Sequence, residues 1–516
     1  MKRLVLVALV LTVLAPVASL LATTIYVDDD APNDPEPGDT SVSDPLEEGS
    51  AEHPFDAIQE GINAAATGDT VFVLDGTYTG TGNRDLDLLG KAITAKSENG
   101  PDVTIIDCQG SEIEPHRGFY FHSGEGQDSV VEGFMVTNGC TAGEFPDSCG
   151  GAVLCLSSSP SFIDCSFTGN SSARFGGAVY CSSSSASFSG CRISSNTAAD
   201  DGGGMRCSES AVALRDCVIS RNVSAARGGG VFCADSSILV RNCLLVRNNS
   251  HNLFISHSPA LVENCTFSGS DGAAIRCWGS NATPTVSNSI LWGDAMGEIL
   301  LGGVPATPVV TYSDVQGGWA GAGNISADPL FMHGPLHDYY LRQIAAGEFP
   351  DSPCVDAGSD TAANLGLDTL ITRTDGIPDA GIVDMGYHAP YALRIYRIVP
   401  AGDDICIFWS VREGVSYVVE WSPDRFTWNE VAVGAVGSWT DVGVLTGTPT
   451  GAKRYYRVRE AAARAAQPDA ATAATVEQTP ASATGETSAG EVGEPKQRNK
   501  RRPGNVTTGA GNVHAR

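Results

Sequence analysis

Apolar and polar positions alternate over short stretches in the middle of the chain, and the pattern returns every 26 residues. In AVLC at 152–155, Val153 and Cys155 are two residues apart, and the residue between them changes from copy to copy. That spacing is typical of a strand with one buried face. Two more apolar positions follow in each copy, at Phe162, Phe188, Leu214 and Val240, and at Phe167, Ile193, Ile219 and Leu245. Each repeat is therefore predicted to form three short strands.

Two columns of cysteine keep the same period. The first column is Cys155, Cys181, Cys207 and Cys233, and the second is Cys165, Cys191, Cys217 and Cys243. Aspartate, glycine or asparagine precedes each second-column cysteine, and these types tolerate left-handed backbone, so the chain is expected to turn a corner there. Asparagines repeat as well, and they are expected to stack as a ladder bonded to turn backbone: Asn170, Asn196, Asn222 and Asn248.

A fixed period of this length indicates stacked repeats. Three strands and three corners per repeat predict an all-β fold, a right-handed parallel β-helix with core repeats at 118–320. Five alternating stretches at 391–460 predict a small antiparallel β-sandwich after it. The segment 461–516 has almost no large apolar residue, so a disordered tail is expected.

Composition narrows the location and the partners of the protein. Residues 1–22 have a basic start, an apolar run and small residues at the end, which predicts a cleaved signal peptide and a secreted, extracellular or cell-surface protein. No later segment is long and apolar enough to predict a transmembrane helix. The formal net charge of −28 argues against nucleic acid as a partner.

Several motifs carry a resemblance to known families. GGAV and GGGV followed by FTGN, ISSN or ISRN resemble the repeats of chlamydial polymorphic outer-membrane proteins and of the bacterial pectate-lyase-like β-helix group. The stretches 25–31 and 53–78 are similar to the entry of such domains, where a short amphipathic helix caps the coil, and 372–390 is similar to their closing segment. The resemblance implies a β-helix domain over 23–390, and 391–460 resembles fibronectin type III modules. It implies no single activity, because this coil serves lyases, hydrolases and adhesins.

One outward-facing column is the candidate binding site. The residue before each first-column position is expected to align along the rod as an exposed stripe: Tyr180, Arg206, Phe232, Phe254 and Arg276. Aromatic faces and arginines suit sugar rings and uronate carboxylates. The alternative is that loops or a neighbouring domain cover the stripe.

The cysteines are interpreted mainly as buried thiols that act as small apolar fillers, with some disulfides or a metal site as alternatives. Cys140 and Cys149 lie within one insertion and are the candidate disulfide. Arg215 and Arg241 near Asp216 would suit a Ca²⁺-dependent lyase, but the surrounding carboxylates are scattered in the sequence.

No catalytic residue and no resident cofactor is assigned, although Ca²⁺ is a possible ligand. Two aspartate groups could hold it, Asp375, Asp379 and Asp384 in one and Asp28, Asp29 and Asp30 in the other, but turn formation explains them more simply. The favoured function is binding, adhesion or surface display, with extracellular polysaccharide or a cell-surface component as partner. A polysaccharide lyase or glycoside hydrolase is the main rival, and a structural surface or matrix protein is the third hypothesis.

Overall fold

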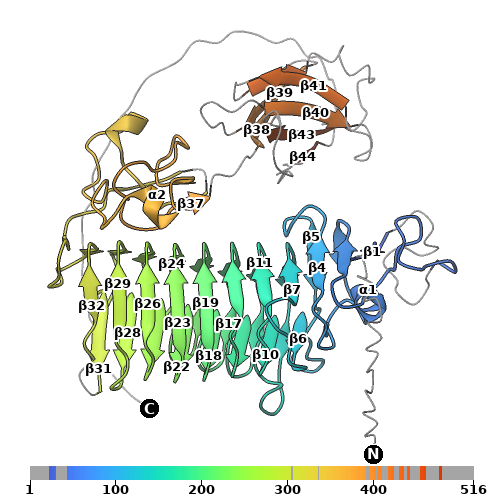
Figure 1. Cartoon of the computed structure of the whole chain (residues 1–516), viewed down its shortest axis with the longest axis horizontal. Coiled ribbons are helices and arrows are strands. Elements are labelled where there is room, and N and C mark those ends of the chain that lie inside the picture. The colour runs from blue at the N-terminus through green and yellow to red at the C-terminus, as the bar shows by residue number, and fades with distance from the viewer. Residues whose placement is uncertain are drawn as a thin grey trace, which may run out of the picture.

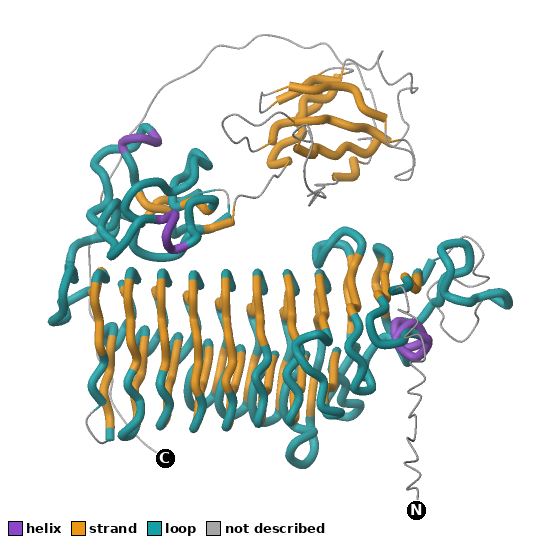
Figure 2. The backbone as a smooth tube through the Cα atoms, in the orientation of Figure 1, coloured by secondary structure: helices purple, strands orange, loops and turns teal. Residues whose placement is uncertain are grey.

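A computed structural model describes residues 22–30, 44–303, 306–334 and 336–390, and seven strands beyond residue 390. Figures 1 and 2 show a rod of stacked turns between residues 24 and 315. Every strand pair within the rod is parallel, which confirms the predicted parallel β-helix. None of the helices in the described part of the chain is long and apolar enough to cross a membrane.

Four parallel sheets run along the rod, numbered here in the order in which one turn visits them. Sheet 1 contains β6 (Phe119–Phe121), β10 (Val153–Leu156), β14 (Val179–Ser182), β18 (Met205–Ser208), β22 (Val231–Ala234), β25 (Leu253–Ser256), β28 (Ile275–Trp278) and β31 (Ile299–Gly302). Sheet 2 contains β1 (Thr24–Val27), β2 (Thr70–Val73), β4 (Thr94–Ser97), β7 (Val130–Glu132), β11 (Ser161–Ile163), β15 (Ser187–Ser189), β19 (Ala211–Arg215), β23 (Ser237–Arg241), β26 (Ala260–Glu263), β29 (Pro284–Ser287) and β32 (Val309–Thr311).

The remaining two sheets complete each turn. Sheet 3 contains β3 (Gly76–Tyr78), β5 (Thr104–Asp107), β8 (Met135–Thr137), β12 (Ser166–Thr168), β16 (Arg192–Ser194), β20 (Val218–Ser220), β24 (Leu244–Val246), β27 (Thr266–Ser268), β30 (Ile290–Leu291) and β33 (Asp314–Val315). Sheet 4 is short and contains β9 (Cys140–Thr141), β13 (Ser171–Ser172), β17 (Thr197–Ala198) and β21 (Val223–Ser224). The fourth strand was not predicted, because two residues are too few to show an alternating pattern. The coil also begins before the predicted core at 118, in turns that lack the cysteine marker.

Register and corners follow the sequence pattern. Cys155 pairs with Cys181, and Phe162 pairs with Phe188, so residues one period apart lie one above the other. The Phe162 and Phe188 rings stack inside the coil with centroids 4.8 Å apart. Asp164 and Asp216, which precede second-column cysteines, have φ angles of 50° and 55°, and this left-handed backbone makes the predicted corner.

The asparagine ladder is confirmed. The Oδ1 atom of Asn196 accepts hydrogen bonds from the backbone N–H of Asn170 at 2.9 Å and from its Nδ2 at 3.1 Å. Asn222 serves Asn196 in the same way, and Asn248 serves Asn222. These side chains are almost completely buried, and each turn is thereby tied to the next.

Both ends of the predicted β-helix domain fold as additional segments. Helix α1 (Ile58–Ala64) lies at the N-terminal end and buries Ile58 and Ile62, as the amphipathic pattern predicts. At the other end, β34 (Phe331–Met332), β35 (Tyr340–Leu341), a 3₁₀ turn (Ile344–Ala346), α2 (Ala362–Leu365), β36 (Leu370–Ile371) and β37 (Ala389–Pro390) form a closing segment. This segment packs on the outside of sheet 3, where Tyr387 and Tyr340 cluster with Leu244 and Val246.

Beyond residue 390 the strands are antiparallel. One sheet contains β38 (Ile395–Ala401), β39 (Asp404–Trp409) and β42 (Ser438–Asp441). The other contains β40 (Tyr417–Ser422), β41 (Asn429–Gly434), β43 (Arg454–Glu460) and β44 (Val476–Gln478). This pair of small antiparallel sheets agrees with the predicted fold class. Residues 1–21 of the predicted signal peptide and, apart from β44, the predicted disordered tail lie outside the described residues.

Candidate functional site

The predicted stripe lies on the outer side of sheet 1, and its alignment is confirmed. Tyr180 pairs with Arg206, which pairs with Phe232 on the next turn. Phe232 in turn pairs with Phe254, and Phe254 with Arg276. The five residues therefore form one continuous column along the rod.

The predicted exposure of this column is wrong for its aromatic members. Tyr180, Phe232 and Phe254 are only 3%, 2% and 5% exposed, and Arg206 and Arg276 are partly buried. The corner before each strand covers them. Phe175 contacts Tyr180 with ring centroids 6.0 Å apart, and Phe145 contacts the same ring edge-to-face at 6.1 Å.

The exposed groups on this side come from the corners instead. Arg174 and Arg227 are each about half exposed, and so is the ring of Phe145. Sequence reasoning missed both arginines. Arg174 lies two residues before the glycine group of its repeat, in RFGG at 174–177, and Arg227 lies one residue before that of its own, in RGGG at 227–230. Their fixed place relative to the glycines was the signal in the sequence that could have located them. We call Phe145, Arg174, Phe175, Arg206, Arg227 and Phe232 the arginine–aromatic face.

Guanidinium groups stack on rings throughout this face. Arg206 lies 3.5 Å from the centroid of Phe175 and 5.2 Å from that of Phe232. Arg227 lies 4.9 Å from Phe232, and Arg174 lies 4.8 Å from Phe175. Such cation–π contacts hold the planar groups at fixed positions and leave the hydrogen-bonding edges of the groups uncovered by the rings.

A buried carboxylate anchors two of the three arginines. Asp201 accepts hydrogen bonds from Nε and Nη2 of Arg227, both at 2.9 Å, and one from Arg206 at 3.4 Å. Arg174 lies 3.8 Å from the half-exposed Asp200. Burial lowers the pKa of the Arg206 guanidinium, which still stays charged at neutral pH. On this face three guanidinium groups meet two carboxylates, and the exposed Glu144 and Asp147 lie within two residues of Phe145.

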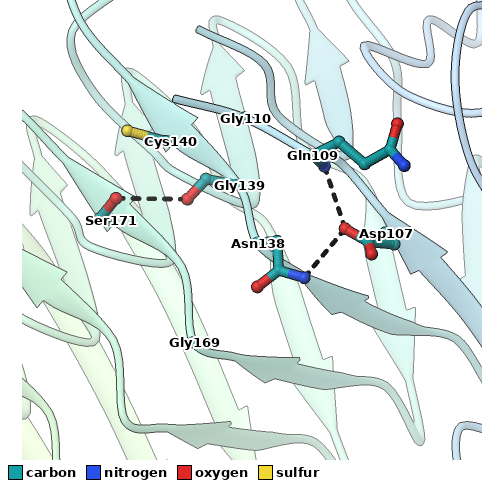
Figure 3. Close-up of a pocket in the computed structure, with 8 residues that line it drawn as sticks. All are labelled: Asp107, Gln109, Gly110, Asn138, Gly139, Cys140, Gly169 and Ser171. Atoms are coloured by element: carbon teal, nitrogen blue, oxygen red, sulfur yellow. Dashed lines mark hydrogen bonds between the residues drawn. The ribbon is translucent and has the colours of Figure 1, made fainter. Parts of the chain in front are cut away.

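A hollow lies at the corner that follows sheet 3, between the turns after β5, β8 and β12 (Figure 3). It has a volume of about 420 Å³ and is lined by Asp107, Gln109, Gly110, Asn138, Gly139, Cys140, Gly169 and Ser171. Asp107 Oδ1 accepts hydrogen bonds from the backbone N–H of Gln109 and from Nδ2 of Asn138, both at 3.0 Å. The hollow is wide and polar, and its one carboxylate is already bonded to the wall.

The predicted disulfide is not present. Cys140 is a free, partly exposed thiol at this hollow, whereas Cys149 is a free thiol buried in the cluster of Leu154 and Tyr180. The two cysteines therefore belong to different environments, although only eight residues separate them in the sequence. The other cysteines that the structure describes are free and buried as well.

The residues considered for a lyase or a Ca²⁺ site have protein partners. Arg241 pairs with Glu263 on the next turn, and Asp216 accepts a hydrogen bond from Asn242 at 2.8 Å. Arg215 is exposed. In the closing segment, each of the three aspartates is bonded separately: Asp375 to Arg373, Asp379 to His388, and Asp384 to Thr372. Turn and network formation thus accounts for this group.

Two other acidic groups do converge among the described residues. The carboxylates of Asp28, Asp29 and Asp30 lie within 4.8 Å of one another, and so do those of Glu47, Asp56 and Glu60. The second group was not found from the sequence, because its members come from a loop and a helix that meet only in the folded cap.

Comparisons with known proteins agree with the fold. Residues 92–260 match the family described as "Right handed beta helix region", and the coil is accordingly a right-handed parallel β-helix. No curated protein is significantly similar to the chain.

Two solved structures are similar at low identity. Pectate lyase Pel9A is 11% identical with a TM-score of 0.39, covering 71% of this chain and 96% of its own. The A-module of Azotobacter vinelandii mannuronan C-5 epimerase AlgE4 is 14% identical with a TM-score of 0.28, covering 52% of this chain and 84% of its own. With TM-scores this low, neither likeness contributes to the interpretation of the site.

Proposed function

We propose that this right-handed β-helix protein binds an acidic extracellular polysaccharide along the arginine–aromatic face, as a binding or surface-display module without chemistry of its own. The observation that carries the proposal is the stack of Arg174, Arg206 and Arg227 on phenylalanine rings, on one face of a chain with a net charge of −28. An acidic chain repels anions over most of its surface, so an anion would bind selectively where cationic groups are gathered.

The chemistry of the face fits uronate residues. A guanidinium group binds a carboxylate through two parallel N–H···O bonds, and an aromatic ring packs against the apolar face of a sugar. Arg174 and Arg227 offer half-exposed guanidinium groups, and Phe145 offers an exposed ring. Arg174 precedes β14 and Arg227 precedes β22, so these two groups are two turns apart along the rod, as contacts with an extended polymer require.

Binding rather than cleavage is supported by how the carboxylates of this face are used. A lyase of the Ca²⁺-dependent kind needs several carboxylates that converge on one cation and a base beside them. Asp201 instead holds Arg206 and Arg227, and Asp200 lies beside Arg174. Both acids therefore neutralise and position arginines.

The test is affinity electrophoresis of the full chain in gels containing polygalacturonate, alginate or neutral dextran. We expect retardation by the two acidic polymers only, and loss of retardation as salt is raised. The double variant Arg174→Ala/Arg227→Ala should weaken binding at least about tenfold. Arg192→Ala, which removes an exposed arginine from sheet 3, is the matched control and should leave binding unchanged.

Four results would overturn the proposal. Equal retardation by dextran would remove the role of the arginines, and so would full retention by the double variant. Release of unsaturated products from the acidic polymers would make the protein a lyase. Absence of both binding and release would favour the structural surface or matrix protein.

Export is the premise of an extracellular partner. It is supported by the basic, apolar and small-residue pattern of residues 1–22. Expression of the full gene product with its leader, followed by N-terminal sequencing of the extracellular fraction, should give a chain that starts near residue 23. A chain retained inside the cell with Met1 intact would contradict this premise.

A further inference from the structure

The N-terminal end of the coil is closed by a loop that binds the edge of β1. Phe55 forms a parallel bridge with Val27, and its backbone N–H donates to Tyr26 O at 3.0 Å. Tyr26 N–H in turn donates to Gly49 O at 2.9 Å. The loop of residues 44–57 therefore covers the open edge of sheet 2 and leads directly into α1.

Three carboxylates meet where this loop joins the helix. Glu47 comes from the loop, Asp56 lies at its end, and Glu60 lies in the first turn of α1; one oxygen from each is within 4.8 Å of the others. Asp56 is only 5% exposed, and neither of its carboxylate oxygens has a hydrogen-bond partner. Glu47 Oε2 and Glu60 Oε2 are also enclosed and without a partner.

Buried polar atoms normally have partners, and buried carboxylates left without one are costly. In the part of the chain that the structure describes, none of the three forms an ion pair with lysine, arginine or histidine. His53, which lies in the same loop, is engaged with Asp44 at 2.6 Å. Burial, followed by the charges of Glu60 and Asp56, raises the pKa of Glu47 to about 7, and burial raises the pKa of Glu60. The group thus lacks a positive charge.

We propose that Glu47, Asp56 and Glu60 form a Ca²⁺ site that fastens the capping loop to α1. The donors are all carboxylate oxygens, which favour Ca²⁺ over Zn²⁺. Oxygens that share one Ca²⁺ at about 2.3–2.6 Å can lie up to roughly 4.6–5.2 Å apart, which covers the spacing found here, whereas Mg²⁺ demands a tighter octahedron. Backbone carbonyls or water would complete the coordination. The cation would lock the first turn and keep the edge of β1 covered.

The neighbouring Asp28, Asp29 and Asp30 group does not carry the same inference. Asp30 is exposed and its backbone N–H donates to Asp28 Oδ1, while Asp29 has interactions of its own. This difference makes Asp28 a useful control. It tests whether a bound cation belongs to one acidic group or to the other.

The experiment titrates CaCl₂ into the full chain, after treatment with EDTA and its removal, by calorimetry and thermal unfolding at pH 8. We expect a binding heat and a rise in Tm of about 2–5 °C. Asp56→Asn should lower the Ca²⁺ affinity at least about tenfold and remove the rise. Asp28→Asn should keep both. If Asp56→Asn does not fold, Glu60→Gln is read in its place.

No binding heat in the parent chain, or loss of binding in Asp28→Asn with retention in Asp56→Asn, overturns the assignment. Neither result bears on polysaccharide retardation, which uses a different face.

Discussion

The two cysteine columns look alike in the sequence but differ in the structure. First-column thiols such as Cys155 and Cys207 are buried within sheet 1, and no described thiol of that column donates to a protein oxygen. Second-column thiols donate to carbonyls: Cys191 Sγ lies 3.4 Å from Ser189 O, and Cys217 Sγ lies 3.1 Å from Arg215 O. The same side chain therefore serves as an apolar filler in one column and as a hydrogen-bond donor in the other.

The backbone explains the difference. Each second-column cysteine follows a residue with left-handed φ, such as Gly190 or Asp216, which turns the preceding carbonyl towards the thiol. Cys155 and Cys207 lie inside regular strands, where backbone carbonyls point along the ladder to the neighbouring turns.

Later turns of the coil carry other residues in place of the cysteines of both columns. Further along the rod, Ile255 occupies the first column and is buried, and Ser289 and Ser313 continue the second. Ser289 Oγ donates to Ser287 O at 2.8 Å, as the thiols do, and its own oxygen accepts from Cys265 N–H. Position along the turn, rather than residue type, thus decides which chemistry is tolerated.

The largest effect on stability is expected in the asparagine ladder, where buried side chains bond backbone groups, as the second-column thiols do. Asn196→Ala leaves the buried Asn170 N–H without its acceptor and removes one hydrogen bond each from Asn170 Nδ2 and Phe167 O. At roughly 1–3 kcal/mol for the orphaned N–H and about 0.5–1.5 kcal/mol for each of the other two bonds, the free energy of unfolding should fall by about 2–6 kcal/mol. Urea unfolding followed by circular dichroism measures it. The exposed Asn99→Ala is the control, and an equal midpoint for the two variants would mean that the ladder adds no stability.

In the first column, a hydroxyl should be poorly tolerated. Cys207→Ser buries an oxygen in a strand interior where the described neighbours offer it no carbonyl, so a loss of about 1–3 kcal/mol is expected. Cys207→Val keeps an apolar side chain of similar size and should change stability by less than about 1.5 kcal/mol. A serine variant as stable as the valine variant would erase the distinction between the columns.

In the second column the preference should reverse. Cys191→Ser keeps a donor for the carbonyl of Ser189 and should stay within about 1 kcal/mol of the parent chain, as the natural serines of this column suggest. Cys191→Val removes the donor and should cost about 1–2 kcal/mol. The four variants at Cys191 and Cys207, measured by the same urea transitions, test the reversal directly. Parallel rankings at both positions would refute it.

Much of the coil could be predicted from the sequence because its contacts are periodic. The inward positions, the left-handed corners and the asparagine ladder each follow from residues 26 apart, and the structure confirms them. The burial of Tyr180 and Phe232 could not be predicted in this way. Phe145 and Phe175 cover Tyr180, and Arg227 lies over Phe232, from corners whose direction is set by the folded turn.

The acidic group of the cap could not be predicted from the sequence, for a related reason. Glu47, Asp56 and Glu60 have no periodic spacing, and they meet only because the loop adds itself to the edge of β1. The arginines at the corners are an intermediate case. Arg227 and its partner Asp201 occupy the same position in successive repeats, and Phe175 occupies it one repeat earlier. Because the residue type changes from copy to copy, this column shows no constant charge in the sequence.

The smallest effect concerns reactivity rather than stability, and it separates both buried columns from Cys140. Burial raises the pKa of the Cys155 and Cys191 thiols well above the usual value, so few thiolates form and none is accessible. Cys140 is partly exposed at the corner that follows sheet 3. Treating the folded chain with iodoacetamide at pH 8, without reductant, should label Cys140 within minutes and leave both columns unlabelled, as read by peptide mass spectrometry. Labelling of Cys140 only after reduction would instead reveal a disulfide, and rapid labelling of Cys155 or Cys191 would show that the turns open readily.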